Sequence, residues 1–206
     1  MMISVLQTPA SIFQARLRPA VEIYVDAMGY ARTLIDARTH AWARHMRNPN
    51  WCGAMAIAHP DDVDPTEALA DLTNPLVGVA YCYTGQSNQW WSQQVRAGMA
   101  QHGWKVQATA AVLSNYCELT EIHVSPNYQG HGIGRTLLQE LMRDRPDQRV
   151  LLSTPEVPAE ANRAWQLYRS LGFVDILRDF YFPGDDRPFA ILGAKLPLTS
   201  TADVAQ

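Results

Sequence analysis

Three glycines at alternate positions precede an amphipathic helix pattern in the stretch SPNYQGHGIGRTLLQELM, residues 125–142. Gly130, Gly132 and Gly134 leave the backbone almost bare of side chains where the helix should begin. Glycine permits close approach, and a helix start offers unpaired N–H groups with a dipole end of about +0.5 charge. The pattern predicts a loop and helix start that suit an anion such as a pyrophosphate.

Two familiar phosphate-binding loops do not fit this spacing. The dinucleotide fingerprint GxGxxG needs its third glycine three residues after the second, whereas Gly134 follows Gly132 by two. A P-loop, GxxxxGK[ST], needs a lysine after its last glycine, and none follows here. Taken alone, the pattern also fits a glycine-rich turn without a ligand.

The remaining chain alternates helical and strand patterns. Apolar residues recur at helical spacing over residues 19–48, where Gly29 is expected to separate two helices, and residues 59–75 read as a polar turn region. The expected strands are 51–60, 76–85, 115–124, 148–156, 173–182 and 187–198, with room for one more near the N-terminus, and the further helices are 87–101, 135–143 and 159–172. A mixed α/β fold with helices packed on the sheet follows.

Composition indicates a soluble globular protein. The hydrophobic fraction is 47% and the charged fraction is 18%. The net charge is −3 and no run of lysine and arginine occurs, which argues against nucleic acid or a membrane as partner. No apolar run reaches the roughly 18–20 residues of a membrane span. The N-terminal segment has no basic residue before Arg16, which argues against a secretory signal. The expected localisation is the cytoplasm.

The three cysteines, Cys52, Cys82 and Cys117, stand far apart in apolar segments. This odd number and wide spacing is typical of buried thiols in a reducing compartment and not of a disulfide framework. A zinc site would need close ligand pairs such as CxxC, and the sequence has none. No metal is therefore expected.

The glycine stretch gains a more specific interpretation from its neighbours. QGHGIG, with Gln129, Gly132 and Gly134, resembles the [RQ]xxGx[GA] motif of the GNAT superfamily of acyl-CoA-dependent N-acyltransferases. The run ELTEIHVSPNYQGHGIGRTLLQELM is similar to the family's fourth strand, signature loop and third helix. Further along, ANRAWQLYRSLGF resembles its second motif, NxxAxxLYxxxGF, which places a tyrosine late in a helix. The resemblance is specific from Glu118 to Phe173 and compatible in layout from about residue 51 to 198.

The resemblance implies a fold and a cofactor. The expected fold is a central mixed, mostly antiparallel sheet, splayed between its fourth and fifth strands, with helices on both faces. Residues 1–206 would form a single N-acetyltransferase domain with an N-terminal helical part at 1–50, an insertion at 86–114 near the acceptor and an acetyl-CoA-binding core at 115–173. Acetyl-CoA is the implied co-substrate. A homodimer is kept open, because dimers are common among similar proteins.

The resemblance also implies the residues that hold acetyl-CoA. The backbone N–H of Val124 is the candidate that polarises the thioester carbonyl. Gln129 replaces the arginine often found at its position, which weakens the local positive field. Arg135 can reach a CoA phosphate, although exposed arginines are common at helix starts, and Asn162 either contacts the pantetheine arm or caps its helix. The full candidate set is Ile122, His123, Val124, Gln129, Gly130, His131, Gly132, Ile133, Gly134, Arg135 and Asn162.

Tyr168 stands at the family's tyrosine position, where the resemblance implies the acid that protonates the departing thiolate. Its phenol has an unperturbed pKa near about 10, which suits that transfer. The alternative is a packing role, because Trp165, Leu167 and Leu171 belong to the same amphipathic helix.

Two carboxylates of the fourth strand compete for the role of base. Strand alternation places Glu118 on one face and Glu121 on the other, together with His123, unless a bulge changes the phase. Counted back from Gly132, Glu118 falls where several family members place a base. Glu121 is the second candidate and His123 the third, while a water relay needs no single side chain. A solvated or salt-bridged carboxylate is the alternative for each.

The acceptor is expected to be a primary amine of a small molecule or a protein. Trp90 and Trp91 are adjacent in the expected insertion, so at least one should lie at its edge, facing a pocket or partner. Cys82 and Cys117 lie on expected strands without an obvious paired base, which favours direct attack in a ternary complex over a covalent enzyme intermediate. The alternative function is a non-catalytic acyl-CoA-binding sensor or scaffold module.

Overall fold

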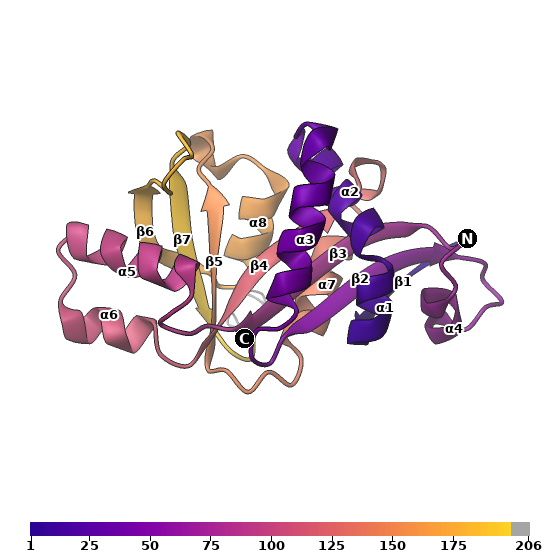
Figure 1. Cartoon of the computed structure of the whole chain (residues 1–206), viewed down its shortest axis with the longest axis horizontal. Helices are drawn as coiled ribbons and strands as arrows, with labels where there is room; N and C mark the ends of the chain where they lie inside the picture. Colours follow the sequence, from indigo (N-terminus) through magenta and orange to yellow (C-terminus); the bar gives the residue numbers. More distant parts are fainter. Residues whose placement is uncertain (199–206) are drawn as a thin grey trace. The chain divides into compact units, whose positions relative to one another are not determined.

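The computed structural model describes residues 1–198 of the chain and contains two compact units (Figure 1). The first unit comprises Met1–Tyr83 and Thr120–Arg143, and the second comprises Thr84–Leu119 and the described residues from Asp144 onward. Strand β4 contributes to both units, because the boundary falls between Leu119 and Thr120. The single-domain organisation expected from the sequence stays a prediction.

Within residues 1–198, seven strands form one mixed sheet in the order β1-β2-β3-β4-β5-β7-β6. Their bounds are β1 Met2–Thr8, β2 Cys52–His59, β3 Leu76–Thr84, β4 Tyr116–Val124, β5 Arg149–Pro155, β6 Val174–Phe180 and β7 Phe189–Lys195. The pairs β1–β2, β2–β3, β5–β7 and β6–β7 are antiparallel, whereas β4 and β5 are parallel. The predicted mixed and mostly antiparallel α/β fold is confirmed. Pairing of β4 with β5 covers Tyr116↔Arg149, Cys117↔Val150 and Glu118↔Leu151.

Helices surround these strands. The α-helices are α1 Ala10–Ala15, α2 Leu17–Met28, α3 Ile35–His45, α4 Pro65–Ala70, α5 Trp90–Gln101, α6 Val106–Val112, α7 Ile133–Met142 and α8 Arg163–Ser170. The described part of the chain also has three short 3-10 turns, η1 Arg32–Leu34, η2 Pro126–Tyr128 and η3 Pro158–Glu160. Among the described residues, no helix is long and apolar enough to cross a membrane.

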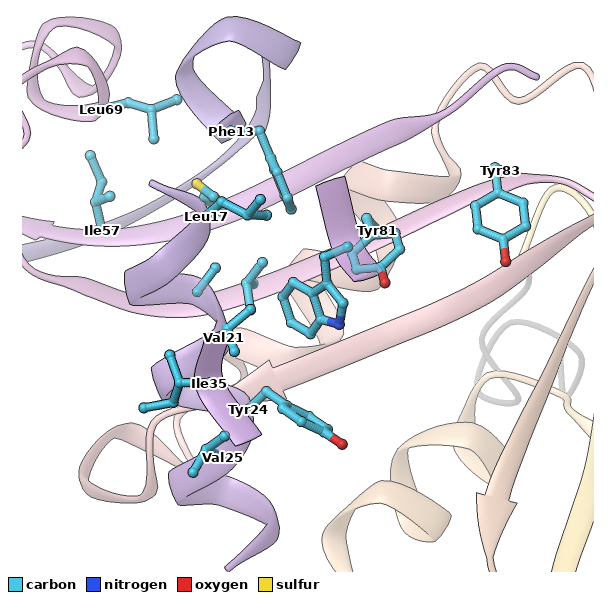
Figure 2. Packing of buried hydrophobic residues seen from close by; sticks show 14 of the residues in the cluster. Phe13, Leu17, Val21, Tyr24, Val25, Ile35, Ile57, Leu69, Tyr81 and Tyr83 are labelled. Atoms are coloured by element: carbon cyan, nitrogen blue, oxygen red, sulfur yellow. The ribbon is translucent and has the colours of Figure 1, made fainter. Parts of the chain in front are cut away.

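One face of the first unit carries its large apolar core (Figure 2). Phe13 of α1 and Val21 of α2 belong to one buried cluster with Ile57 of β2 and Tyr81 of β3. Alternate residues of a strand point to opposite faces, so the odd-numbered residues of β2 and β3 supply this core. The amphipathic pattern at 19–48 thus produces helices that cover one side of these strands, as expected from the sequence.

The opposite face of the first unit is built from small residues, and α7 packs there. The even-numbered positions include Ala54 and Ala56 of β2 and Gly78 of β3. A Cβ added at Gly78 would lie 3.0 Å from Cδ1 of Leu137 and 3.3 Å from Cγ2 of Ile133. The lack of bulky side chains therefore lets α7 approach the strands closely, which positions its N-terminus at the signature loop.

The second unit has its own apolar core beneath α5. Trp91, Val95 and Met99 of α5 form a buried cluster with Leu151 of β5 and Ile191 of β7. The predicted insertion at 86–114 is therefore an integral part of this core. It contains α5, which begins at Trp90, and α6, a helix that the sequence pattern did not reveal.

Several element bounds differ from the sequence expectation. The N-terminal strand β1 is present, so residues 1–50 are not wholly helical. Helix α7 begins at Ile133, two residues before its expected start. The segment 59–75, expected as a turn region, contains α4, whose first turn is capped by the Asp64 carboxylate accepting from the N–H groups of Thr66 and Glu67.

Candidate active site

The signature loop is anchored to the end of β4. The N–H of Ser125 donates to the carbonyl of Val77 at 2.9 Å, and η2 follows directly. The Gln129 side chain donates from Nε2 to the carbonyl of Val124 at 3.1 Å. The first residue of the motif therefore fastens the loop to its own strand, which holds the backbone at Val124 in place.

Glycine conformation shapes the rest of the loop. Gly130 and Gly132 have φ angles of 87° and 80°, a left-handed region that other L-residues enter at a cost. A Cβ added at Gly132 would meet nothing within 4 Å, so conformation and not crowding requires glycine there. Gly134 already lies within the first turn of α7. The three glycines thus serve two purposes, a left-handed turn and a bare helix start.

The start of α7 is suited to an anion. Gly132 is its N-cap and provides no side-chain hydrogen bond to the first turn. The first N–H groups of an α-helix have no partner within the helix, and the dipole makes this end attractive to negative charge. Ile133 is buried, so it presents only its backbone, whereas His131 is exposed and Arg135 is half-buried. The assignment of these residues to the phosphate groups of coenzyme A stays a prediction.

Glu121 and His123 form a hydrogen-bonded pair in the first unit. Nε2 of His123 lies 2.6 Å from Oε2 of Glu121, and the two side chains are 12% and 16% exposed. The prediction that these residues share a face of β4 is confirmed. The His123 ring lies 5.0 Å from the Tyr24 ring and is stacked at 6.5 Å on Trp42, so aromatic rings surround the pair.

His45 of α3 extends this polar group, and sequence reasoning missed it. Its Nδ1 lies 2.9 Å from the hydroxyl of Tyr81. Burial lowers the pKa of His45, and the negative charge of Glu121 acts in the opposite direction. The sequence signal was weak, because His45 ends a helix far from β4 in the chain.

Glu118 lies in the second unit, in different surroundings. Its side chain is 4% exposed and shares a strand face with Tyr116, two residues earlier, which packs against Trp91. Burial raises the pKa of Tyr116 to about 12, and the nearby charge of Glu118 contributes to that rise. Glu118 is therefore a buried carboxylate near α5 and not a solvated one.

Tyr168 is held by the end of α8. The N–H of Phe173 donates to the carbonyl of Tyr168, and the N–H of Gly172 donates to that of Arg169, both at 3.1 Å. With Gly172 at a φ of 78°, these bonds form a Schellman motif. The Tyr168 ring is 6% exposed and lies 5.5 Å from the Phe173 ring. Tyr168 therefore packs in the core and also stands at the motif position that implies the acid.

Asn162 caps its helix. Its Oδ1 accepts a hydrogen bond from the N–H of Trp165 at 2.9 Å, so this oxygen caps the helix, the alternative to contact with the pantetheine arm. Asn162 also stands six residues before Tyr168, whereas the NxxAxxLY spacing places the asparagine seven residues before the tyrosine. The match of Asn162 to the motif's asparagine is therefore one residue out of register.

An ion-pair network fixes the segment between β5 and α8. Arg169 donates to both oxygens of Glu160, from Nε at 2.9 Å and Nη2 at 2.6 Å, and also pairs with Asp175. Arg178 donates to Glu156 from Nε and Nη2, and its Nη1 lies 3.0 Å from Glu160. The guanidinium carbons of Arg169 and Arg178 lie 5.0 and 4.9 Å from the centre of the Trp165 ring.

This network was not foreseen, because its charges come from segments that are separate in the sequence. It holds η3, where Ala159 and Glu160 have φ angles of 51° and 53°. Left-handed backbone at two adjacent non-glycine residues carries strain, which the surrounding contacts must outweigh. The network therefore fixes the loop that leads into the helix of Tyr168.

Comparisons with known proteins identify the family. A family model described as "Acetyltransferase (GNAT) domain" matches residues 86–175. A GCN5-like protein acetyltransferase of Mycobacterium tuberculosis is 43% identical over 206 residues, which cover 96% of this chain and 100% of the relative. The chain belongs to the GNAT acetyltransferases. The resemblance drawn from the two motifs is confirmed, and the chain is an enzyme of the acetyltransferase class.

Two other GNAT proteins extend the comparison. The ribosomal protein bS18 alanine N-acetyltransferase of Escherichia coli is 37% identical over 94 residues, or 45% of this chain and 63% of the relative. A Salmonella typhimurium acetyltransferase structure, determined with its cofactor acetyl-CoA, has a TM-score of 0.58 at 16% identity and covers 97% of both chains. At that identity the likeness concerns the fold.

Proposed function

We propose that this GNAT acetyltransferase uses acetyl-CoA and transfers the acetyl group directly to a primary amine within a ternary complex. The start of α7 carries the proposal, because Gly132 adopts a left-handed conformation and leaves the first turn without a side-chain cap. Unpaired N–H groups at a helix start suit the pyrophosphate of coenzyme A. The Salmonella typhimurium relative, determined with acetyl-CoA, supports the same choice of cofactor.

The assignment of cofactor-binding residues follows the loop. Ile122, His123 and Val124 would present strand backbone to the pantetheine arm, and residues 129–135 would hold the phosphates. Within that loop, Gln129 and Ile133 act through backbone position, since one side chain bonds to Val124 and the other is buried. Arg135 and His131 are the side chains that supply positive charge or donors. Asn162 has a weaker claim because its oxygen caps α8.

The transfer itself requires three groups of the protein. The amine nitrogen attacks the thioester carbon, the new C–N bond forms, and the C–S bond breaks. We assign the N–H of Val124 as the donor that stabilises the carbonyl oxygen while it gains negative charge. We assign Tyr168 as the acid that donates a proton to the leaving thiolate. Glu118 is assigned as the base that receives the amine proton, and Glu121 is its alternative.

Direct transfer is favoured over a covalent enzyme intermediate. Cys82 of β3 and Cys117 of β4 are both buried. A nucleophilic thiol must reach the thioester carbon, and burial within strands works against that access. The amine is therefore assigned as the group that attacks acetyl-CoA.

A protein amine is the first acceptor to test. The Mycobacterium tuberculosis relative, similar over the whole chain, is named a protein acetyltransferase, and the Escherichia coli relative acts on ribosomal protein bS18. Small amines remain the second class. The matching experiment measures free-thiol release from acetyl-CoA with a panel of peptides, small amines and a crude protein extract.

Two glycine variants test the cofactor site. Gly132→Ala and Gly103→Ala replace glycines with φ angles of 80° and 77°, each with nothing within 4 Å of an added Cβ. The strain added should therefore be similar, but only Gly132→Ala should weaken acetyl-CoA binding, by about tenfold or more for a loss of roughly 1.4 kcal/mol. Equal binding by both variants would remove the loop from the cofactor site. Tight acetyl-CoA binding without thiol release for any acceptor would support the sensor module.

A further inference from the structure

Two cysteines lie directly opposite each other on neighbouring strands of the first unit. In the antiparallel pair β2–β3, the register places Cys52 across from Cys82. Facing residues of antiparallel strands have Cα atoms about 4.5–5.5 Å apart and side chains on the same face. A disulfide accepts Cα separations of about 4.4–6.8 Å. The register therefore gives the two Cα atoms a separation that a disulfide can span without a change of strand pairing.

We propose that Cys52 and Cys82 form a dithiol that peroxide oxidises reversibly to a cross-strand disulfide. The proposal is independent of the acetyl-transfer chemistry. Both residues are thiols in the structure. Disulfides in reducing compartments are usually transient and redox-sensing, so the expectation of a reducing compartment is compatible with such a role.

Access differs between the two thiols and assigns their order of reaction. Cys52 is half-buried and borders a cavity of about 330 Å³, which Gln7, Thr8 and Trp51 also line. Cys82 is buried. A small neutral oxidant such as hydrogen peroxide therefore reaches Cys52 first, and Cys82 is the resolving partner.

The surroundings leave room for the bond. The next pair on the same face of these strands is Ala54↔Ala80, whose side chains are single methyl groups. Gly53, between Cys52 and Ala54 on β2, faces the other side of the strands, where an added Cβ would lie 2.5 Å from the Phe13 ring. Bulky packing thus holds the strand from the opposite side, while the cysteine side has small neighbours.

The reaction balances with one peroxide and two thiols. The Cys52 thiolate attacks the O–O bond, which gives a sulfenic acid on Cys52 and releases hydroxide. The Cys82 thiol then gives up its proton, its thiolate attacks the sulfenic sulfur, the S–S bond forms as the S–O bond breaks, and the departing hydroxide takes up that proton as water. Two electrons pass from the two sulfurs to the peroxide. A thiol reductant reverses the process by exchange through a mixed disulfide.

Cys117 provides a matched control. It is also buried on a strand, but its register partner across β4–β5 is Val150, which carries no sulfur. Peroxide treatment is therefore not expected to form a cross-strand disulfide at Cys117. Cys82 and Cys117 are both buried on strands, so a linkage to Cys52 at Cys82 and not at Cys117 reports the cross-strand register.

The test treats the full chain with hydrogen peroxide, digests it without reduction and identifies linked peptides by mass spectrometry. We expect a Cys52–Cys82 peptide that dithiothreitol removes, a higher melting midpoint for the oxidised wild type, and the same behaviour in Cys117→Ser. Cys52→Ser and Cys82→Ser should lose both the linkage and the shift. Oxidation of Cys52 to sulfinic or sulfonic acid without linkage, or a linkage through Cys117, would overturn the proposal.

A second measurement covers the case in which a serine variant folds poorly. A trivalent arsenical, phenylarsine oxide, bridges two nearby thiols and needs no oxidant. The reduced wild type and Cys117→Ser should each bind one equivalent, which blocks both Cys52 and Cys82 from alkylation. Cys52→Ala should bind at least tenfold more weakly. Binding that survives in Cys52→Ala, or none in the folded wild type, would contradict a facing dithiol.

Discussion

Nε2 of His123 lies 2.6 Å from the Glu121 carboxylate, within a group of aromatic rings that includes Tyr24 and Trp42. This pair is partly exposed, whereas Glu118 is almost fully buried and lies in the other unit. The two carboxylates therefore lie in different surroundings on one strand, and substitution of each tests a different candidate base. The kcat values of a variant at each position can therefore show which carboxylate acts as the base.

The first prediction concerns the base. Glu118→Gln should lower kcat by about 10²–10⁴-fold, the range expected when a general base is removed. Glu121→Gln removes only the partner of His123 and should lower kcat by no more than about tenfold on the same basis. Steady-state kinetics with a saturating amine, together with the melting midpoint of each variant, measure this. The reverse order would transfer the role of base to Glu121.

A second prediction concerns the acid. Tyr168→Phe keeps the ring that packs on Phe173 and the backbone bonds of the Schellman motif, so folding should be preserved. Loss of the phenol should lower kcat by about 10²-fold or more, with little change in the KM for acetyl-CoA. Tyr181→Phe, at an exposed tyrosine, is the matched control and should leave kcat unchanged. Full turnover by a folded Tyr168→Phe variant would leave Tyr168 with packing alone.

The central strands and the signature loop were predictable because their signals are local. Glycines before one helix and after another are visible in the sequence, and in the structure Gly132 and Gly172 have φ angles of 80° and 78°. Helix α4 was missed although Asp64 and Pro65 are typical start residues, because a polar segment was read as a turn.

The polar interactions of the site were less predictable. His45 lies near Glu121 because α3 packs beside this part of β4, where Trp42 stacks on the His123 ring. The arginines around Trp165 likewise meet Glu156 and Glu160 through strand pairing and a loop conformation, neither of which leaves a local pattern. Tertiary contacts between distant segments decide such pairs, whereas periodicity reports only which face of an element is apolar.

A third prediction follows from the network at η3. The bond from Arg169, with help from Arg178, lowers the pKa of Glu160 to about 2 from a usual value of 4.5. A carboxyl with a depressed folded-state pKa stabilises the fold above its unfolded pKa, and that stabilisation is lost as pH falls from about 4.5 toward 2. The urea midpoint of the wild type should therefore fall over this window.

Glu160→Gln tests the origin of that acid sensitivity. The variant should be less stable than the wild type at pH 7, and the difference should shrink as the pH approaches 2, because protonation then increasingly neutralises the wild-type carboxyl. Glu67→Gln replaces an exposed glutamate of α4 and serves as the control for loss of a surface charge. A difference between wild type and Glu160→Gln that does not change with pH would contradict the role of the ion pair.

The last prediction separates the two adjacent tryptophans. Trp90 is 56% exposed and stacks on Phe182 with ring centres 5.4 Å apart, whereas Trp91 is buried and donates from Nε1 to Ser153. Truncation of Trp91 should cost about 3–5 kcal/mol of stability, as for other buried aromatic residues. Trp90→Ala should fold normally.

If the exposed ring contacts the acceptor, Trp90→Ala should raise the acceptor KM several-fold and leave the KM for acetyl-CoA unchanged. Tyr181→Ala removes a similarly exposed aromatic side chain of the second unit and controls for a general loss of surface area. Initial rates with the best acceptor from the thiol-release panel provide the measurement. Unchanged acceptor kinetics in Trp90→Ala would show that the exposed ring does not contact the amine substrate, and its role would then be packing on Phe182.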